Sequence, residues 1–317
     1  MQPIAITLGD PAGIGPETIA KAFRDAPDAT RGCFVAGDVG TLRRASALVS
    51  GPGQPALPVA LIETPSQVWS VPPRCIPVLQ IIELLAPVPY AQVNALAGKV
   101  AADCVLWACR AALRGELAAL VTAPLHKEAL AAAGLPYPGH TELLQFEAAA
   151  FLGKPVQDVP VRMMLANDEL RTVLVSIHLS LRQAIEAVTF DNVLQTLRIT
   201  HRSVGAALGR LPRIGVAGLN PHAGEGGLFG REEIDTILPA IQAARAEGLD
   251  VHGPYAPDTV FMRARAKNGQ PGEFDVVVAM YHDQGLIPVK YLGGGAGRER
   301  HPGFTAGAYQ PGPRHGV

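Results

Sequence analysis

The stretch DVVVAMYHDQG, residues 275–285, places a short β-branched apolar run directly before a polar, glycine-containing segment. An apolar run of this length, bounded by turn residues, indicates a strand. Similar runs recur along the chain and alternate with Ala- and Leu-rich segments whose apolar residues have helical spacing. This alternation predicts an α/β fold with a largely parallel sheet.

The same patterns, followed outward from this stretch, give the expected elements. The expected strands are residues 4–8, 33–36, 59–62, 117–121, 161–165, 172–177, 213–218 and 275–280. The expected helices are residues 17–24, 98–113, 127–133, 143–151, 182–187, 192–208 and 232–247. Segments 51–58 and 71–89 are rich in proline and are expected to be loops or edge structure.

Composition excludes several classes of protein. The chain of 317 residues has 27 Lys and Arg against 28 Asp and Glu, and 48% of it is apolar. It can therefore bury a large core, and it lacks the basic surface that nucleic acids or anionic membranes would require. It contains no apolar stretch of the roughly 18–20 residues that a membrane span needs, and its first residues do not have the pattern of a signal peptide. We expect a cytoplasmic enzyme.

The four cysteines are predicted to be buried thiols of a cytosolic protein. They contain no CxxC spacing and do not cluster with histidine, which argues against disulfides and against zinc ligation. They are Cys33, Cys75, Cys104 and Cys109.

Polar residues and glycines follow five of the predicted strands, where the carboxyl ends of parallel strands form a binding crevice. Three of these ends carry His178, His222 and His282. Three imidazoles with a carboxylate such as Asp258 or Asp283 can hold a divalent cation. No local metal-binding spacing is present, and each histidine is equally compatible with a hydrogen-bonding loop residue.

Two glycine-containing loops and one helix start complete the candidate site. Gly13 and Gly15 lie in a segment typical of an anion loop before a helix, although a tight turn explains them as well and no GxGxxG is present. Gly224 and Gly226 lie in the loop 220–227, where backbone amides could approach a ligand. His140 and Thr141 open a predicted helix and serve either a site or only its N-cap.

At these residues the chain resembles the 4-hydroxythreonine-4-phosphate dehydrogenase family of vitamin B6 (pyridoxal 5'-phosphate) biosynthesis. The most specific matches are GLNPHAGEGG (218–227) and AMYHDQGLIPVKY (279–291). The other matches are TLGDPAGIGPE (7–17), TAPLHKEAL (122–130), GHTELL (139–144), REEIDTI (231–237) and PDTVF (257–261).

The resemblance implies the fold and the reaction. The fold would be a two-lobed α/β/α unit of the isocitrate and isopropylmalate dehydrogenase type, which lacks the Rossmann GxGxxG. The reaction would be the oxidation of 4-phosphooxy-L-threonine at C3 by NAD or NADP, with decarboxylation to 3-amino-2-oxopropyl phosphate. The expected metal is zinc, magnesium or cobalt.

The resemblance also implies an assembly and roles for single residues. The enzyme would be a homodimer whose metal ligands come from both subunits. His178, His222 and His282 would be the metal ligands, while His140, Thr141 and Lys290 would bind substrate. Lys290 and His140 would also serve catalysis, and Asp258 and Asp283 would support the ligands.

Residues 1–317 are expected to form one two-lobed catalytic unit, with lobes 1–125 plus 278–293 and 126–277. The resemblance ends after Gly293, and reading the tail with a one-base offset recovers the family's continuation, which predicts a frameshift. The tail 294–317 is expected to be poorly ordered. The family's substrate-binding Asn and Arg would fall at Glu299 and Ala308, which weakens substrate binding.

Other functions remain open at this point. A sister dehydrogenase would act on 4-phospho-threonate, 4-phospho-erythronate or a dihydrodiol carboxylate. A metal-dependent hydrolase or lyase would use the same histidines without a nicotinamide. An inactive copy would still dimerise and bind the metal ion but would not catalyse the reaction.

Overall fold

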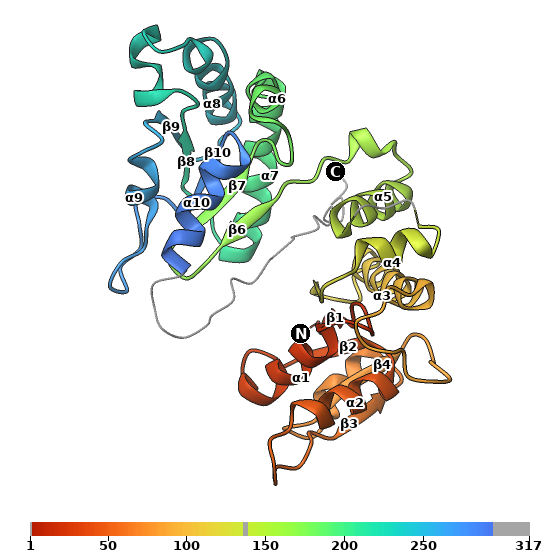
Figure 1. The fold of residues 1–317 in the computed structure, drawn as a ribbon. Coiled ribbons are helices and arrows are strands. Elements are labelled where there is room, and N and C mark those ends of the chain that lie inside the picture. Colours follow the sequence, from red (N-terminus) through yellow and green to blue (C-terminus); the bar gives the residue numbers. More distant parts are fainter. Residues whose placement is uncertain (1, 136–138, 294–317) are drawn as a thin grey trace, which may run out of the picture. The chain divides into compact units, whose positions relative to one another are not determined.

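The computed structural model describes residues 2–135 and 139–293, which fall into two compact units, the second beginning at Arg162. Each unit contains a five-stranded sheet with helices packed on it (Figure 1). The α/β architecture predicted from the sequence is confirmed. No helix in these described ranges is long and apolar enough to cross a membrane.

The first unit contains a fully parallel sheet in the order β3-β4-β2-β1-β5. Its strands are β1 (Ile4–Thr7), β2 (Cys33–Gly37), β3 (Val59–Ile62), β4 (Ile76–Gln80) and β5 (Ala119–Thr122). Its helices are α1 (Gly15–Asp25), α2 (Val39–Val49), α3 (Ala95–Leu113), α4 (Lys127–Ala132) and α5 (His140–Leu152), with short 3-10 turns at Pro65–Ser70 and Val156–Asp158. Residues of α1 and α2 share one apolar cluster with the inner strands β1, β2 and β4.

The second unit has a mixed sheet in the order β6-β7-β10-β8-β9, in which only β6 runs antiparallel. Its strands are β6 (Met164–Ala166), β7 (Arg171–Leu174), β8 (Ile214–Ala217), β9 (Val251–Tyr255) and β10 (Val276–Ala279). Its α-helices are α6 (Leu181–Glu186), α7 (Phe190–Leu208), α8 (Leu238–Ala246), α9 (Val260–Ala264) and α10 (His282–Gly293). A 3-10 segment spans Pro221–Gly227, and a π-helical turn, Glu233–Ile237, leads into α8.

The central strand β10 is buried on both faces, which explains its uninterrupted apolar sequence. Val276 and Val278 pack into the cluster formed with α7 and α8, while Val277 and Ala279 face the cluster formed with α9 and α10. Burying a valine side chain stabilises a fold by about 1.5–3 kcal/mol. The strand is therefore the centre of a three-layer unit, and packing on both of its faces fixes the position of the carboxyl end of β10.

The prediction for segment 71–89 is wrong, because this segment contains the interior strand β4. Pro77 lacks an amide hydrogen and argued against a central strand. In the structure Pro77 pairs only with β3, and the ladder to β2 begins one residue later at Val78. The proline therefore does not interrupt the pairing with β2.

The predicted lobe limits also differ from the structure. The lobe 1–125 was expected to include residues 278–293, but β10 pairs with β7 and β8, and α10 packs on β6 and β7. The first unit extends to Val161, so the division lies beyond the expected residue 125. The predicted frameshift and disordered tail concern residues 294–317, which lie outside the described residues.

Candidate active site

The carboxyl edge of the second sheet carries the three histidines singled out in the sequence. His178 follows β7, His222 follows β8 and His282 begins α10 directly after β10. The rings of His178 and His282 lie together, with 5.7 Å between their centroids. Both line a cavity of about 400 Å³ together with Ser176, Leu181 and other residues of the same edge.

Two buried polar side chains hold this edge together. The Ser176 hydroxyl donates to the Met280 carbonyl at 3.0 Å and so joins the end of β7 to the end of β10. The Gln284 side chain donates to the Gly218 carbonyl at 2.8 Å and accepts from the Met280 amide at 2.7 Å. Sequence reasoning missed both residues, because Ser176 bonds a carbonyl 104 residues away and Gln284 bonds the Gly218 carbonyl 66 residues away.

His222 lies in an unusual left-handed turn. All residues from His222 to Gly226 have φ between 43° and 80°, although His222, Ala223 and Glu225 are not glycine. A non-glycine residue in this region costs about 1–2 kcal/mol. Such a turn persists only where surrounding contacts hold it, and turns of this kind cluster at functional sites.

Carboxylates orient two of the three imidazoles. Asp283 Oδ1 lies 2.7 Å from Nδ1 of His282, and Glu225 Oε2 lies 3.1 Å from Nδ1 of His222. A carboxylate at Nδ1 leaves Nε2 as the nitrogen available to a metal ion. Imidazole nitrogens are donors that suit an ion such as zinc, whereas magnesium prefers oxygen ligands.

The full three-histidine cage remains a prediction. Within residues 2–135 and 139–293, no three His, Cys, Asp or Glu side chains lie close enough to hold a metal ion. His222 packs instead on Phe229, with ring centroids 6.0 Å apart. The structure thus brings together His178, His282 and Asp283 but does not add His222 to them.

The other predicted residues of the second unit are exposed. Asp258 precedes α9, and its side chain makes no hydrogen bond or ion pair within the described part of the chain. Lys290 lies on α10, about 12 Å along the helix axis from His282 at 1.5 Å per residue. Its ammonium group likewise has no partner among the described residues, so it is available to an anion.

In the first unit, His140 begins α5 and carries an unsatisfied nitrogen. Its Nε2 is buried and has no hydrogen-bond partner in the described ranges. Burial lowers the pKa of the imidazole, against a contact with the Ala123 backbone that raises it. Burial therefore favours the uncharged form of this imidazole. The helix cap is Gly139 without a side-chain bond, so neither His140 nor Thr141 serves as the N-cap.

Packing explains two of the four glycines proposed as anion loops. A Cβ on Gly15 would lie 2.9 Å from the Leu8 carbonyl oxygen, and one on Gly224 would lie 2.7 Å from Glu233 Oε2. At Gly226 a Cβ would meet no neighbour, but the φ of +66° favours glycine. At Gly13 a Cβ would make only ordinary contacts and φ is not positive, so neither reason requires a glycine there. Their role toward a cofactor remains a prediction.

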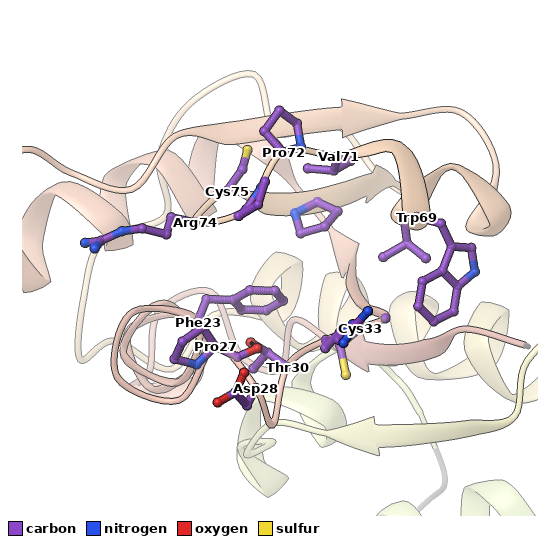
Figure 2. A pocket seen from close by; sticks show the side chains of 15 residues that line it. Phe23, Pro27, Asp28, Thr30, Cys33, Trp69, Val71, Pro72, Arg74 and Cys75 are labelled. Carbon is purple, nitrogen blue, oxygen red and sulfur yellow. Dashed lines mark hydrogen bonds between the residues drawn. The ribbon is translucent and has the colours of Figure 1, made fainter.

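A second cavity, of about 410 Å³, lies in the first unit where β2 and β4 begin. Figure 2 shows Phe23 and Thr30 on one wall, facing Val71 and Pro72 on the other. This end of the strands is opposite their carboxyl ends, and none of the predicted site residues lines the cavity. All four cysteines are free thiols, as predicted, but the prediction that all are buried is wrong for Cys75, which is half-buried directly before β4.

Comparison with known proteins places the chain among related sequences and structures. A model of the family described as pyridoxal phosphate biosynthetic protein PdxA matches residues 29–304. A 4-hydroxythreonine-4-phosphate dehydrogenase of Beijerinckia indica is 48% identical over 291 residues, covering 92% of this chain and 81% of that protein. A D-threonate 4-phosphate dehydrogenase of Pectobacterium atrosepticum is 41% identical, covering 92% and 84%.

The fold is shared as well. The crystal structure of 4-hydroxythreonine-4-phosphate dehydrogenase from Klebsiella pneumoniae matches with a TM-score of 0.80 and 41% identity, covering 93% of this chain and 86% of that one. The resemblance predicted from the sequence motifs is confirmed by these matches. The chain therefore belongs to the family of pyridoxal phosphate biosynthetic protein PdxA, a family of dehydrogenases.

Proposed function

We propose that the chain oxidises 4-phosphooxy-L-threonine at C3, with loss of CO2, to 3-amino-2-oxopropyl phosphate in pyridoxal phosphate biosynthesis. The 48% identity to a protein named 4-hydroxythreonine-4-phosphate dehydrogenase supports this substrate. The observation that carries the chemistry is the His178–His282 pair, with the Asp283 carboxylate at Nδ1 of His282. The proposal includes a homodimer with shared metal ligands, as the resemblance implies.

The second unit would provide the metal site. His178 and His282 would hold a divalent cation, with His222 as the third ligand. Such a cation, when bound, supplies a Lewis acid that lowers the pKa of a coordinated hydroxyl and stabilises negative charge on oxygen. Asp283 fixes the ring of His282 and raises its basicity as a ligand.

The nicotinamide, NAD or NADP, supplies the hydride acceptor. The C3–H bond breaks as the hydride leaves, and the hydroxyl proton passes to a base. The resulting 3-oxo acid loses its carboxylate as CO2, and carbon C2 gains a proton. The protein has to orient the substrate and handle these two protons.

Two side chains suit these tasks. Burial favours the uncharged imidazole of His140, and its buried Nε2 has no hydrogen-bond partner within residues 2–135 and 139–293, so a substrate hydroxyl or phosphate could satisfy it. The exposed ammonium of Lys290, which has no partner in the part of the chain that the structure describes, would neutralise the substrate carboxylate or phosphate. Thr141, in the same helix turn as His140, would add a hydroxyl to the substrate contacts.

The test is formation of reduced nicotinamide from 4-phosphooxy-L-threonine with Zn²⁺, Co²⁺ or Mg²⁺. It is run on the chain as given and on a version with the frame restored after Gly293. His178→Ala and His282→Ala should abolish turnover and also remove the Co²⁺ absorption bands. His252→Ala changes a half-buried histidine on β9 that is bonded to Asp250; it is the matched control and should keep both. Turnover that survives both His→Ala changes would refute the metal role.

A second candidate is supported by the relative named D-threonate 4-phosphate dehydrogenase at 41% identity. That substrate differs at C2, where a hydroxyl replaces the amino group. Comparing kcat/KM for the two phosphorylated acids separates the candidates. A higher value for D-threonate 4-phosphate, in the chain with the restored frame, would replace the first proposal.

A further inference from the structure

The left-handed turn at His222 is held from one side by a single buried carboxylate. Glu233 begins the π-helical turn before α8, and its side chain is only 2% exposed. Its Oε1 accepts hydrogen bonds from the backbone amides of Leu219 and Asn220, both at 2.7 Å. Its Oε2 accepts from the Asn220 side-chain amide at 2.9 Å.

These bonds act on the residues directly before the turn. Leu219 and Asn220 connect the end of β8 to the turn that carries His222. Glu233 has no ion-pair partner among the described residues, so amide donors alone satisfy its buried carboxylate. Burying a carboxylate costs free energy unless hydrogen bonds satisfy its oxygens.

The fit of the carboxylate extends into the turn itself. A Cβ on Gly224 would lie 2.7 Å from Glu233 Oε2, and one on Gly218 would lie 3.0 Å from Oε1. The two glycines therefore make room for the Glu233 side chain before and within the turn. The carboxylate thus contacts the turn as well as the amides that lead into it.

We propose that Glu233 is the positioning residue for His222: its carboxylate, by gathering the Leu219 and Asn220 amides, holds the turn that presents the imidazole to a divalent cation. The inference rests on the proposed function for the identity of that cation. Glu233 belongs to the REEIDTI segment, and the proposed mechanism gives this residue no role. Because it concerns the turn, it also makes a prediction that is independent of turnover.

The first measurement is Co²⁺ titration of the metal-free chain by absorption. Glu233→Ala removes every acceptor and should weaken Co²⁺ binding by about tenfold or more, as loss of a residue that orients a metal ligand does. Glu233→Gln keeps one acceptor oxygen for the two backbone amides and should fall between wild type and Glu233→Ala. The order wild type, Gln, Ala distinguishes positioning from a general loss of fold.

Asp275→Asn is the matched control. It removes another buried carboxylate of the same unit, at the amino end of β10, away from the carboxyl edge that carries the turn. It should lower stability but leave Co²⁺ affinity within about twofold of wild type. Equal weakening by Asp275→Asn and Glu233→Ala would overturn the inference, as would unchanged affinity in Glu233→Ala.

The second measurement is amide hydrogen exchange over residues 218–226 without metal. Glu233→Ala should speed exchange there, whereas Asp275→Asn should not. If the wild-type chain binds no Co²⁺, the proposed metal function fails, and the exchange measurement decides the inference alone. Unchanged exchange in Glu233→Ala would then refute the positioning role.

Discussion

Asp275 offers a quantitative test of how β10 is held at its amino end. Its carboxylate is 7% exposed and accepts from both terminal nitrogens of Arg210 at 2.7 and 2.8 Å. It also accepts from the Arg213 amide at 2.8 Å and from the Arg213 guanidinium at 3.0 and 3.2 Å. The perturbation is Asp275→Asn, which keeps the shape but removes the charge and one acceptor oxygen.

The expected loss is about 2–3 kcal/mol of the free energy of unfolding. A hydrogen bond to a charged group contributes about 1.5–3 kcal/mol, and the asparagine amide would face donors instead of accepting from them. Arg210 and Arg213 remain 52% and 36% exposed, so water solvates them once the carboxylate is gone. This keeps the loss below the roughly 3–5 kcal/mol of a fully buried broken pair.

The effect should depend on pH in a defined direction. Burial alone would raise the pKa of the Asp275 carboxyl, but the hydrogen bonds from Arg210 and Arg213 lower it well below its usual range. A lowered pKa adds stability that is complete above the unfolded pKa, about 3.9, and is lost as the pH falls toward the folded pKa. The difference between wild type and Asp275→Asn should therefore be about 1 kcal/mol smaller at pH 3 than at pH 7.

The assay is urea unfolding of both proteins at pH 7 and pH 3, followed by far-UV circular dichroism. A loss well under about 1 kcal/mol at pH 7 would refute the reasoning, because five hydrogen bonds converge on the carboxylate. A difference that stays constant or grows at pH 3 would refute the assigned direction of the pKa shift.

Three further predictions concern packing and thiol chemistry. Gly98→Ala should destabilise the first unit by about 1–3 kcal/mol, because the new Cβ would lie 2.1 Å from the Ala129 carbonyl oxygen of α4; a midpoint of urea unfolding equal to wild type would contradict it. Leu197→Ala, at a fully buried position of α7, should cost about 2–5 kcal/mol in the same assay, and a loss under about 1 kcal/mol would show that the site collapses. Burial raises the pKa of the Cys104 thiol to about 12, so a thiol reagent added to the native protein should modify the half-buried Cys75 first. Peptide mass spectrometry measures the order of labelling, and early labelling of Cys104 would contradict its burial.

Local patterns in the sequence predicted the strands that carry the site. The apolar runs 213–218 and 275–280 contain β8 and β10. A strand that is buried on both faces requires apolar residues at nearly every position, so its sequence stands out. The strands that escaped prediction contain proline or glycine: β4 includes Pro77, and β9 is VHGPY. In both cases the pairing partner in the sheet decides whether the residue is tolerated, and that partner is invisible from the strand's own sequence.

The candidate site divides in the same way. The neighbouring positions of His178 and His282 follow from the rule that parallel strands bring their carboxyl ends to one edge, and the structure has these rings 5.7 Å apart. Gln284 and Glu233 could not be found, because a buried polar residue leaves no periodic signal. Their partners, Gly218 and Leu219, lie 66 and 14 residues away in the chain.

The turn at His222 shows why this limit is physical. Histidine, alanine and glutamate each disfavour the left-handed conformation, so local preference in the segment 222–226 opposes the observed backbone. The turn exists because contacts from outside it outweigh that preference, and Glu233 provides several of them. Places where local and tertiary preferences conflict are expected at functional sites, since a sequence selected only for stability would remove the conflict. The strain itself is therefore a reason to look for the ligand of His222, beyond the motif in which it lies.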